Sequence, residues 1–221
     1  MNAIEPRKIR LIMELRQQGI HDTRVLAAVE RVPRDVFVLS TFLDQAYDNT
    51  ALPIERGQTI SQPYVVAFMT QALALADRSL RVLEVGTGSG YQAAVLAQLV
   101  RRVFSVERFK SLQRQAEENF RRAKVHNVVT RHGDGYEGWA HQAPFDRIMV
   151  TAAAEDVPEA LKEQLADGGL LIVPVGRDGG HQRLVRIQRV GQEFVEEDLL
   201  PVRFVPMLFG LAPEGEACSG R

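Results

Sequence analysis

Short apolar runs alternate with amphipathic segments between residues 80 and 176, and this alternation is the dominant pattern of the chain. The runs have the length and composition of buried strands, whereas the segments between them repeat apolar positions at helical spacing. The expected strands are 80–85, 102–106, 127–131, 145–151 and 169–175, and the expected helices are 89–100, 108–124 and 158–166. Strands that alternate with helices predict a doubly wound α/β fold, in which a mostly parallel sheet is covered on both faces.

The region before this alternation is predicted to be helical. The expected helices are 4–18, 23–31 and 63–76. Asp22 or Thr23 is expected to cap the second of them, and Pro63 is tolerated in the first turn of the third. Residues 40–62 show little periodicity. Because long loops in compact domains are often functional, we expect a substrate loop or lid there.

The pattern changes again after residue 176. Apolar runs at 184–190 and 193–199 flank a Gly191-Gln192 turn, which is a hairpin signal and predicts an antiparallel edge of the sheet. A last apolar segment covers 202–209, and residues 212–221, which contain Pro, Gly and Ser, are expected to form a disordered tail.

A chain of 221 residues has the length of one large domain. We therefore predict a single domain over 1–211. Its expected parts are the N-terminal helices with the loop (1–79), a cofactor-binding core (80–176) and the C-terminal strands (177–211).

Three glycines alternate directly after the first expected strand, at Gly86, Gly88 and Gly90. A strand, a tight glycine turn and a helix in this order are typical of the nucleotide-binding end of an open α/β sheet. A dinucleotide fingerprint has the spacing G-x-G-x-x-G, and its backbone amides meet a pyrophosphate. The spacing here is G-x-G-x-G, followed by Tyr91, which disfavours an NAD-linked oxidoreductase.

Two carboxylates accompany this turn. Glu84 lies two residues before the first glycine, and Glu107 ends the second expected strand. A carboxylate at position 84 would repel a pyrophosphate but attract a cationic ligand, and one at position 107 is placed to accept hydrogen bonds from both ribose hydroxyls. S-Adenosylmethionine carries a sulfonium, an ammonium and no phosphate, so the pattern favours this cofactor. The alternative is that both residues are ordinary strand-end charges.

Two further strand ends are candidate parts of a site, because ligands of open α/β sheets bind beyond the carboxyl ends of the strands. Asp134, between two glycines after the third strand, is placed to accept from the exocyclic amine of an adenine. A plain turn is the alternative. The small residues 151–154 either leave room for a substrate or pack tightly.

The loop before the third helix is rich in hydrogen-bonding side chains, among them Ser61. With Pro63 as the first helical residue, the cap position falls on Gln62, so helix capping does not account for Ser61. A serine nucleophile would need a G-x-S-x-G elbow and a partnered histidine, and the sequence shows neither. A hydroxyl that positions a substrate is the favoured interpretation.

Composition narrows the classes of function. The chain has 27 Lys and Arg, 28 Asp and Glu and a net charge of −1, a balance that does not indicate nucleic acid or a membrane surface as a partner. Its single cysteine excludes an internal disulfide framework, and no apolar run has the length of a bilayer span. The five histidines are scattered without metal-ligand spacing, so no metal is expected. We expect a monomer in the cytoplasm.

The chain resembles the family of protein-L-isoaspartate O-methyltransferases from Arg10 to about Gly210. The most specific matches are the loop 57–64 (GQTISQPY) and the segment 202–206 (VRFVP). The glycine motif of 82–91 supports the resemblance, although many methyltransferases share it.

The resemblance implies the class I S-adenosylmethionine-dependent methyltransferase fold. It also implies methyl transfer to the free α-carboxylate of L-isoaspartyl residues, and less efficiently of D-aspartyl residues, in damaged proteins and peptides, with S-adenosyl-L-homocysteine as the other product. The methyl ester then closes to a succinimide, whose hydrolysis returns some normal aspartate. Ser61 matches the active-site serine. Positions that match cofactor contacts are Pro63, Tyr64, Val65, Val66, Glu84, Gly86, Thr87, Gly88, Gly90, Glu107, Asp134 and Gly135. Positions that match substrate contacts are Thr59, Ile60, Ser61, Phe204, Val205 and Pro206.

The sequence departs from the family near its end, where the apolar residues 207–209 replace more polar ones of some relatives and the residues after Ala212 have no counterpart. Two other functions stay open. A methyltransferase for RNA or a small metabolite would need a basic or aromatic substrate face. An interaction module without activity predicts loss of the Ser61 loop, which is intact here.

Overall fold

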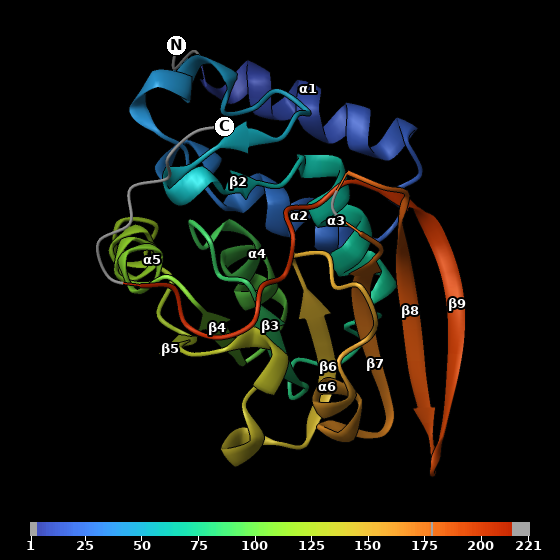
Figure 1. Ribbon diagram of the computed structural model, residues 1–221. Helices are drawn as coiled ribbons and strands as arrows, with labels where there is room; N and C mark the ends of the chain where they lie inside the picture. Colours follow the sequence, from blue (N-terminus) through green and yellow to red (C-terminus); the bar gives the residue numbers. More distant parts are fainter. Residues whose placement is uncertain (1–3, 178, 214–221) are drawn as a thin grey trace.

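A seven-stranded sheet forms the centre of the protein in the computed structural model, which describes residues 4–177 and 179–213 (Figure 1). Its strands follow the spatial order β5-β4-β3-β6-β7-β8-β9. Their bounds are β3 (Arg81–Val85), β4 (Arg102–Glu107), β5 (Val128–His132), β6 (Phe145–Val150), β7 (Leu165–Val175), β8 (Gln182–Val190) and β9 (Glu193–Val202). The strands from β5 to β7 are parallel, and β8 is antiparallel to both of its neighbours. The predicted doubly wound sheet and its antiparallel edge are confirmed.

Helices cover both faces of the sheet. The connecting helices are α4 (Tyr91–Leu99), α5 (Lys110–Arg122) and α6 (Glu159–Glu163), and the N-terminal extension contributes α1 (Ile4–Gln17), α2 (Thr23–Arg31) and α3 (Pro63–Ala72). Successive strand residues face opposite sides. Val82 therefore belongs to one apolar core, shared with the N-terminal helices and α4, whereas Leu83 belongs to a second core on the other face. In Figure 1 the N-terminal extension lies above the upper ends of the strands.

The connection 40–62 is more ordered than its sequence pattern indicates. The short helices η1 (Arg34–Phe37) and η2 (Ser40–Gln45) lead into a two-stranded antiparallel sheet of β1 (Leu52–Pro53) and β2 (Thr59–Ile60), with η3 (Glu55–Gly57) between them. Ala46, Leu52 and Ile60 are buried. The segment is thus packed into the N-terminal core, and its use as a lid stays a prediction.

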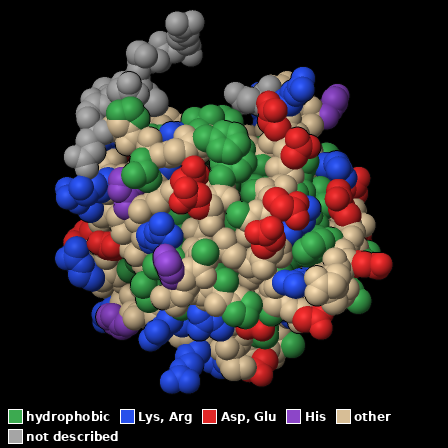
Figure 2. Space-filling model, turned by 60° about the horizontal axis from the view of Figure 1, so that its bottom comes forward, with side chains coloured by type: hydrophobic (Ala, Val, Ile, Leu, Met, Phe, Trp, Pro, Cys, Tyr) green, Lys and Arg blue, Asp and Glu red, His purple; other side chains and the backbone are tan. Residues whose placement is uncertain are grey.

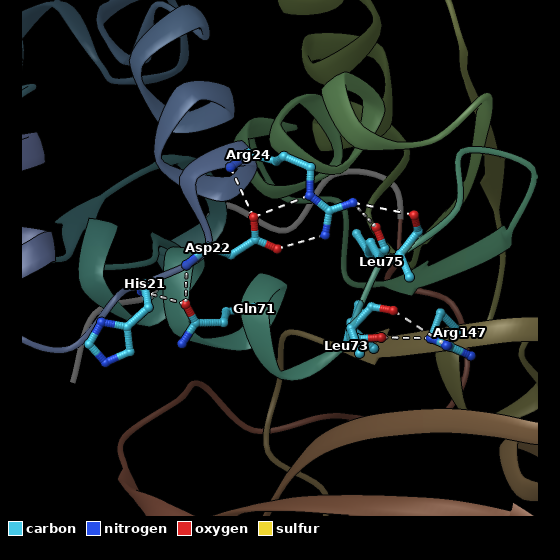
Figure 3. Close-up of polar contacts among 9 residues, drawn as sticks. His21, Asp22, Arg24, Gln71, Leu73, Leu75 and Arg147 are labelled. Atoms are coloured by element: carbon cyan, nitrogen blue, oxygen red, sulfur yellow. Dashed lines mark hydrogen bonds and ion pairs between the residues drawn. The ribbon is translucent and has the colours of Figure 1, made fainter.

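Two arginines hold the chain just after α3 (Figure 3). Arg24 of α2 donates to the carbonyl oxygen of Leu75 at 3.0 Å, and Arg147 of β6 donates to that of Leu73 at 2.6 Å. Ala74 between them has a left-handed φ of 49°. This turn ends α3 at residue 72, earlier than the expected end near 76.

The sequence pattern placed one helix–strand boundary wrongly. Helix α6 covers 159–163 instead of 158–166, because β7 already begins at Leu165, which pairs with Phe145. The early part of β7 is held at the hairpin, where the Gly191 amide donates to the Asp167 carboxylate at 2.7 Å. The hairpin itself is confirmed, with Gly191-Gln192 between β8 and β9.

Three sequence predictions concern the ends and the organisation of the chain. The expected disorder of the tail lies, from residue 214 on, outside the described residues. The division into parts at 79, 176 and 211 stays a prediction. Within 4–177 and 179–213, no helix combines the length and the apolar character that a bilayer span requires.

Candidate functional site

An open cavity of about 810 Å³ lies where the strand order reverses, at the carboxyl ends of β3 and β6. Open α/β sheets bind ligands at this position, because the chain leaves in opposite directions from neighbouring strands. The predicted site residues that line the cavity are Thr59, Ile60, Ser61, Val66, Gly86, Thr87, Gly88, Glu107, Gly135, Val205 and Pro206. The predicted residues Pro63, Tyr64, Val65, Glu84, Gly90, Asp134 and Phe204 lie outside this lining.

The glycine turn brings bare backbone to the cavity floor. Gly86 has a φ of +98°, and a Cβ atom there would lie 2.3 Å from Oγ1 of Thr151. That hydroxyl donates to the Gly86 carbonyl oxygen at 2.6 Å. Gly90, with a φ of +95°, lets α4 begin, and a Cβ there would lie 2.7 Å from the Phe120 ring. Gly86 therefore shapes the floor, whereas Gly90 is needed for packing against α5.

Glu107 at the end of β4 is a buried carboxylate on the cavity wall. Its Oε2 accepts from the Gly88 amide at 2.8 Å, and its Oε1 accepts from the Phe109 amide at 2.9 Å. Burial raises the pKa of Glu107, while these backbone amides act in the opposite direction. Each carboxylate oxygen has a second lone pair, so Glu107 keeps acceptor capacity toward the cavity.

Glu84 lies behind the glycine turn, where its side chain is fully buried. Ser105 donates to its Oε2, and the Ser105 and Thr87 hydroxyls are 2.6 Å apart. Burial raises the pKa of Glu84 to about 8, the charge of Glu107 adds to this shift, and the Ser105 hydrogen bond opposes it. Hydrogen bonds through Ser105 thus connect this carboxyl group to Thr87, which lines the cavity. A direct contact between Glu84 and the cofactor stays a prediction.

Asp134 forms a turn and also ties two segments together. Its Oδ1 accepts from the Tyr136 amide at 2.9 Å, and its Oδ2 accepts from the Gly210 amide at 2.7 Å. Gly135 is on the cavity wall, and a Cβ there would lie 2.6 Å from Val85. The turn expected as an alternative is therefore present, and the contact of Asp134 with adenine stays a prediction.

Ser61 lines the cavity and does not cap α3. Gln62 is the N-cap of α3 and Pro63 its first residue, as the sequence predicts. The amide of Tyr64 donates instead to the side chain of Asn49 at 2.9 Å. The Ser61 hydroxyl makes no hydrogen bond to another described residue, so it is available to a ligand in the cavity.

The C-terminal segment forms the remaining wall. The Ala153 amide donates to the Val205 carbonyl oxygen at 2.8 Å, and the Met207 amide donates to that of Ala153 at 2.7 Å. Beyond it, the Phe209 ring stacks on Tyr136 with centroids 3.8 Å apart. Both interpretations of 151–154 hold in part, since Thr151 and Ala152 line the cavity whereas Ala153 and Ala154 are packed.

Several lining residues escaped the sequence prediction. They are Gln58, Val85, Ser89, Tyr91, Gln92, Val106, Arg108, Phe109, Met207 and Leu208. Arg108 and Phe109 follow Glu107 directly, so the strand-end argument already pointed to them. Gln92, which bonds to Thr70 at 3.0 Å, carries no signal in its own sequence context.

The arrangement fits S-adenosylmethionine. The floor of the cavity is bare backbone that a Cβ would fill, and a buried acceptor faces it at Glu107. Across the described parts of the chain, no three His, Cys, Asp or Glu side chains gather as metal ligands would.

Sequence comparison identifies close relatives. The chain matches the family model "Protein-L-isoaspartate(D-aspartate) O-methyltransferase (PCMT)" over residues 6–211. It is 57% identical to the protein-L-isoaspartate O-methyltransferase of Parvibaculum lavamentivorans, over 97% of both chains. It is 59% identical to that of Rhodospirillum rubrum, over 96% of this chain and 97% of the relative.

Solved structures agree with this relationship. A protein-L-isoaspartate O-methyltransferase superimposes with a TM-score of 0.84 at 31% identity, covering 92% of this chain and 67% of that one. A putative protein-L-isoaspartate O-methyltransferase from Plasmodium falciparum, in complex with S-adenosyl-L-homocysteine, gives 0.79 at 28% identity, covering 90% and 97%. The fold is that of class I S-adenosylmethionine-dependent methyltransferases, and the chain belongs to the protein-L-isoaspartate(D-aspartate) O-methyltransferase family.

Proposed function

We propose that the protein transfers the methyl group of S-adenosylmethionine to the free carboxylate of L-isoaspartyl residues, and more weakly of D-aspartyl residues, in damaged proteins and peptides. Family membership supports this activity. The observation that carries the proposed site is that Ser61, whose hydroxyl is not used in capping, lines the same cavity as the glycine turn and Glu107. The product ester closes to a succinimide, and this begins the repair.

The residues proposed to hold the cofactor are those of the glycine turn together with Glu107 and Gly135, next to Pro63–Val66, Glu84 and Asp134. When bound, S-adenosylmethionine supplies a methyl group that its sulfonium charge has already activated. The substrate carboxylate is ionised at neutral pH, so the protein needs no general base to prepare it.

Catalysis then depends on alignment. Ser61 donates a hydrogen bond to the substrate carboxylate and orients it toward the methyl carbon, while Thr59, Ile60 and residues 204–206 hold the substrate backbone. The cofactor would bring a positive charge and the substrate a negative one, so loops around the cavity that exclude water would favour the reaction.

The activity is tested with labelled S-adenosylmethionine and a pair of peptides that differ only in isoaspartate against aspartate. We expect base-labile label on the isoaspartyl peptide and none on its twin. Cofactor binding by calorimetry, without transfer to either peptide, would retain the site and overturn the substrate.

The role of Ser61 is tested by replacing it with Ala and with Thr. We expect kcat to fall by roughly 10- to 100-fold in Ser61→Ala, because a donor to a reacting oxygen is lost, and to recover in part in Ser61→Thr. The exposed Ser40→Ala is the matched control and should retain full activity. Full turnover and full peptide affinity of Ser61→Ala would exclude the role.

We also propose that the enzyme acts as a cytoplasmic monomer that uses no nucleic acid. The balanced charge supports this, and the face in Figure 2 carries acidic side chains as well as basic ones. A single cysteine suits a reducing compartment. Light scattering after size exclusion should give 24.7 kDa, and a doubled mass would contradict the monomer.

A further inference from the structure

Among the residues that the structure describes, Arg34 is the one buried arginine, and it touches the serine side of the site. Nothing in its sequence context marks it. It opens η1, well before the loop that contains Ser61, and its side chain is 0% exposed. Its guanidinium donates to three carbonyl oxygens, those of Ala46 at 2.8 Å, Thr50 at 3.0 Å and Ser61 at 3.1 Å. One side chain thus joins three points that are spread along 46–61.

Burial of the Arg34 charge is energetically unfavourable, because the guanidinium group loses its contact with water. Burial lowers the pKa of Arg34 to about 10, so the group stays charged at neutral pH, and within the described residues it forms no ion pair with a carboxylate. The carbonyl oxygens and the Tyr91 ring, whose centroid lies 5.0 Å away, are its compensation. The planar guanidinium group holds its donors in a fixed arrangement, so it fixes the positions of several carbonyl oxygens relative to one another.

Two of these partners belong to residues that line the cavity. Ser61 lines it from the loop, and Tyr91 lines it as the first residue of α4, directly after the glycine turn. Asn49 adds a second tie, since its backbone oxygen accepts from the Gln62 side chain at 2.9 Å. Arg34 therefore connects the wall proposed to hold the substrate with the wall proposed to hold the cofactor.

We propose that Arg34 is a positioning residue for methyl transfer, which sets the place of Ser61 relative to the cofactor wall by holding the Ser61 carbonyl and the Tyr91 ring together. The inference rests on the proposed role of Ser61. It extends the part of the N-terminal region in the reaction from the residues that line the cavity to a buried side chain behind them.

The test is Arg34→Lys, which keeps the charge but loses the planar fork and its stacking on the ring. We expect kcat with the isoaspartyl peptide to fall about 10- to 100-fold, whereas the Kd of S-adenosylmethionine stays within about threefold, because a misplacement of about 1 Å costs rate rather than cofactor affinity. Melting temperature and circular dichroism give the folded fraction, to which kcat is normalised.

Arg147→Lys is the matched control. Arg147 also donates to carbonyl oxygens, those of Leu73 and Ala74, but at the far end of α3 (Figure 3). We expect it to lower the melting temperature while kcat per folded molecule stays unchanged. An equal loss of kcat in both lysine variants would show that general loosening is enough, and would overturn the proposal.

A double-mutant cycle separates this inference from the role of Ser61. If Arg34 acts through Ser61, the variant with both Arg34→Lys and Ser61→Ala is no slower than Ser61→Ala alone. Independent, multiplying losses would overturn the proposal for Arg34 and leave Ser61 in place. Full activity of Ser61→Ala would instead remove the role of Ser61. If Arg34→Lys is unstable, single turnovers at low temperature with saturating cofactor give the same comparison, since ligand binding stabilises the folded state.

Discussion

The two sides of the cavity are built in different ways. On the cofactor side, Gly86, Gly88 and Glu107 belong to one strand–turn–helix–strand unit, and Glu107 bonds directly to the turn at Gly88. On the substrate side, Ser61 is held by Arg34, which lies 27 residues earlier in the chain. The first side is a local motif of backbone conformation, and the second is assembled by long-range contacts to carbonyl oxygens. Substitutions on the first side should therefore act on cofactor affinity, and those on the second on turnover.

The strongest test of the cofactor side is Gly86→Ala. The added Cβ would meet Thr151 at 2.3 Å, and the left-handed φ of +98° penalises any side chain, so we expect S-adenosylmethionine affinity to fall by at least about 100-fold. Calorimetry measures the loss. Gly168→Ala is the control, because its φ is +72° but nothing lies within 4 Å, so it should bind the cofactor normally. Equal affinity of the two variants would show that crowding at Gly86 does not matter.

Glu107→Gln sharpens the comparison. The amide nitrogen of Gln would face one of the two backbone amides that Glu107 now accepts from, so one bond to a charged group becomes a repulsion. We expect the Kd of S-adenosylmethionine to rise roughly 10- to 100-fold while the peptide KM changes less than about twofold. The exposed Glu137→Gln controls for the loss of one charge near the site. If Glu107→Gln changed mainly the peptide KM, Glu107 would belong to the substrate side of the cavity.

Glu84 links the cofactor side to pH. Its folded-state pKa of about 8 lies above the value of 4.5 for a free carboxyl, so the unfolded chain loses the proton first as pH rises. The stabilisation is complete below about pH 4.5 and is lost as pH rises toward 8. Relative to Glu84→Gln, the wild-type free energy of unfolding should fall by roughly 1 kcal/mol per pH unit in this window.

Urea unfolding at pH 5.5, 6.5 and 7.5 would measure this difference across the window. Glu163→Gln, at the exposed end of α6, is the control and should follow the wild type at every pH. A wild-type protein that gains stability over Glu84→Gln as pH rises would mean that the buried carboxyl group is ionised in the fold.

The smallest expected effect concerns the C-terminal segment. Phe209→Leu removes the stack on Tyr136 but keeps an apolar side chain, and such stacks contribute about 0.5 to 1.5 kcal/mol. Since Met207 and Leu208 line the cavity, we expect the Kd of S-adenosylmethionine to rise about threefold. Phe194→Leu on β9, away from the cavity, is the control. An equal change of Kd in both variants would show that the stack of Phe209 on Tyr136 does not support cofactor binding.

The same contrast explains what the sequence alone predicts. The strands, the hairpin and the glycine turn follow from local periodicity and turn chemistry, because each is specified by residues that are neighbours in the chain. The N-cap at Gln62 was predictable from Pro63 for the same reason. Ser61 was predicted from the family resemblance of the loop 57–64. Its placement by Arg34 and Asn49 was not predictable, because neither residue carries a local pattern that points to Ser61.

Tertiary contacts also give two of the predicted site residues partners that the sequence pattern does not show. Glu84 reads as a strand-end charge facing a ligand, but the register of β3 with β4 sets it opposite Ser105 and buries it. Asp134 reads as a free acceptor, but Gly210, distant in sequence, donates to it. Periodicity identifies which face of a strand is buried, and it does not identify which distant group completes a side chain's hydrogen bonds.

Ser61 is held by its carbonyl oxygen, and its hydroxyl has no hydrogen-bond partner in the part of the chain that the structure describes. Placement and chemistry at this position are therefore separate properties of the chain, the first stored in the main chain and the second in a side chain of two heavy atoms. A photoreactive or fluorescent side chain, or a thiol for crosslinking, introduced at position 61 would therefore take the same place at the cavity, because the main-chain contact with Arg34 does not depend on the side chain. The same separation leaves the side chain at position 61 free to change while the main chain around it keeps its place.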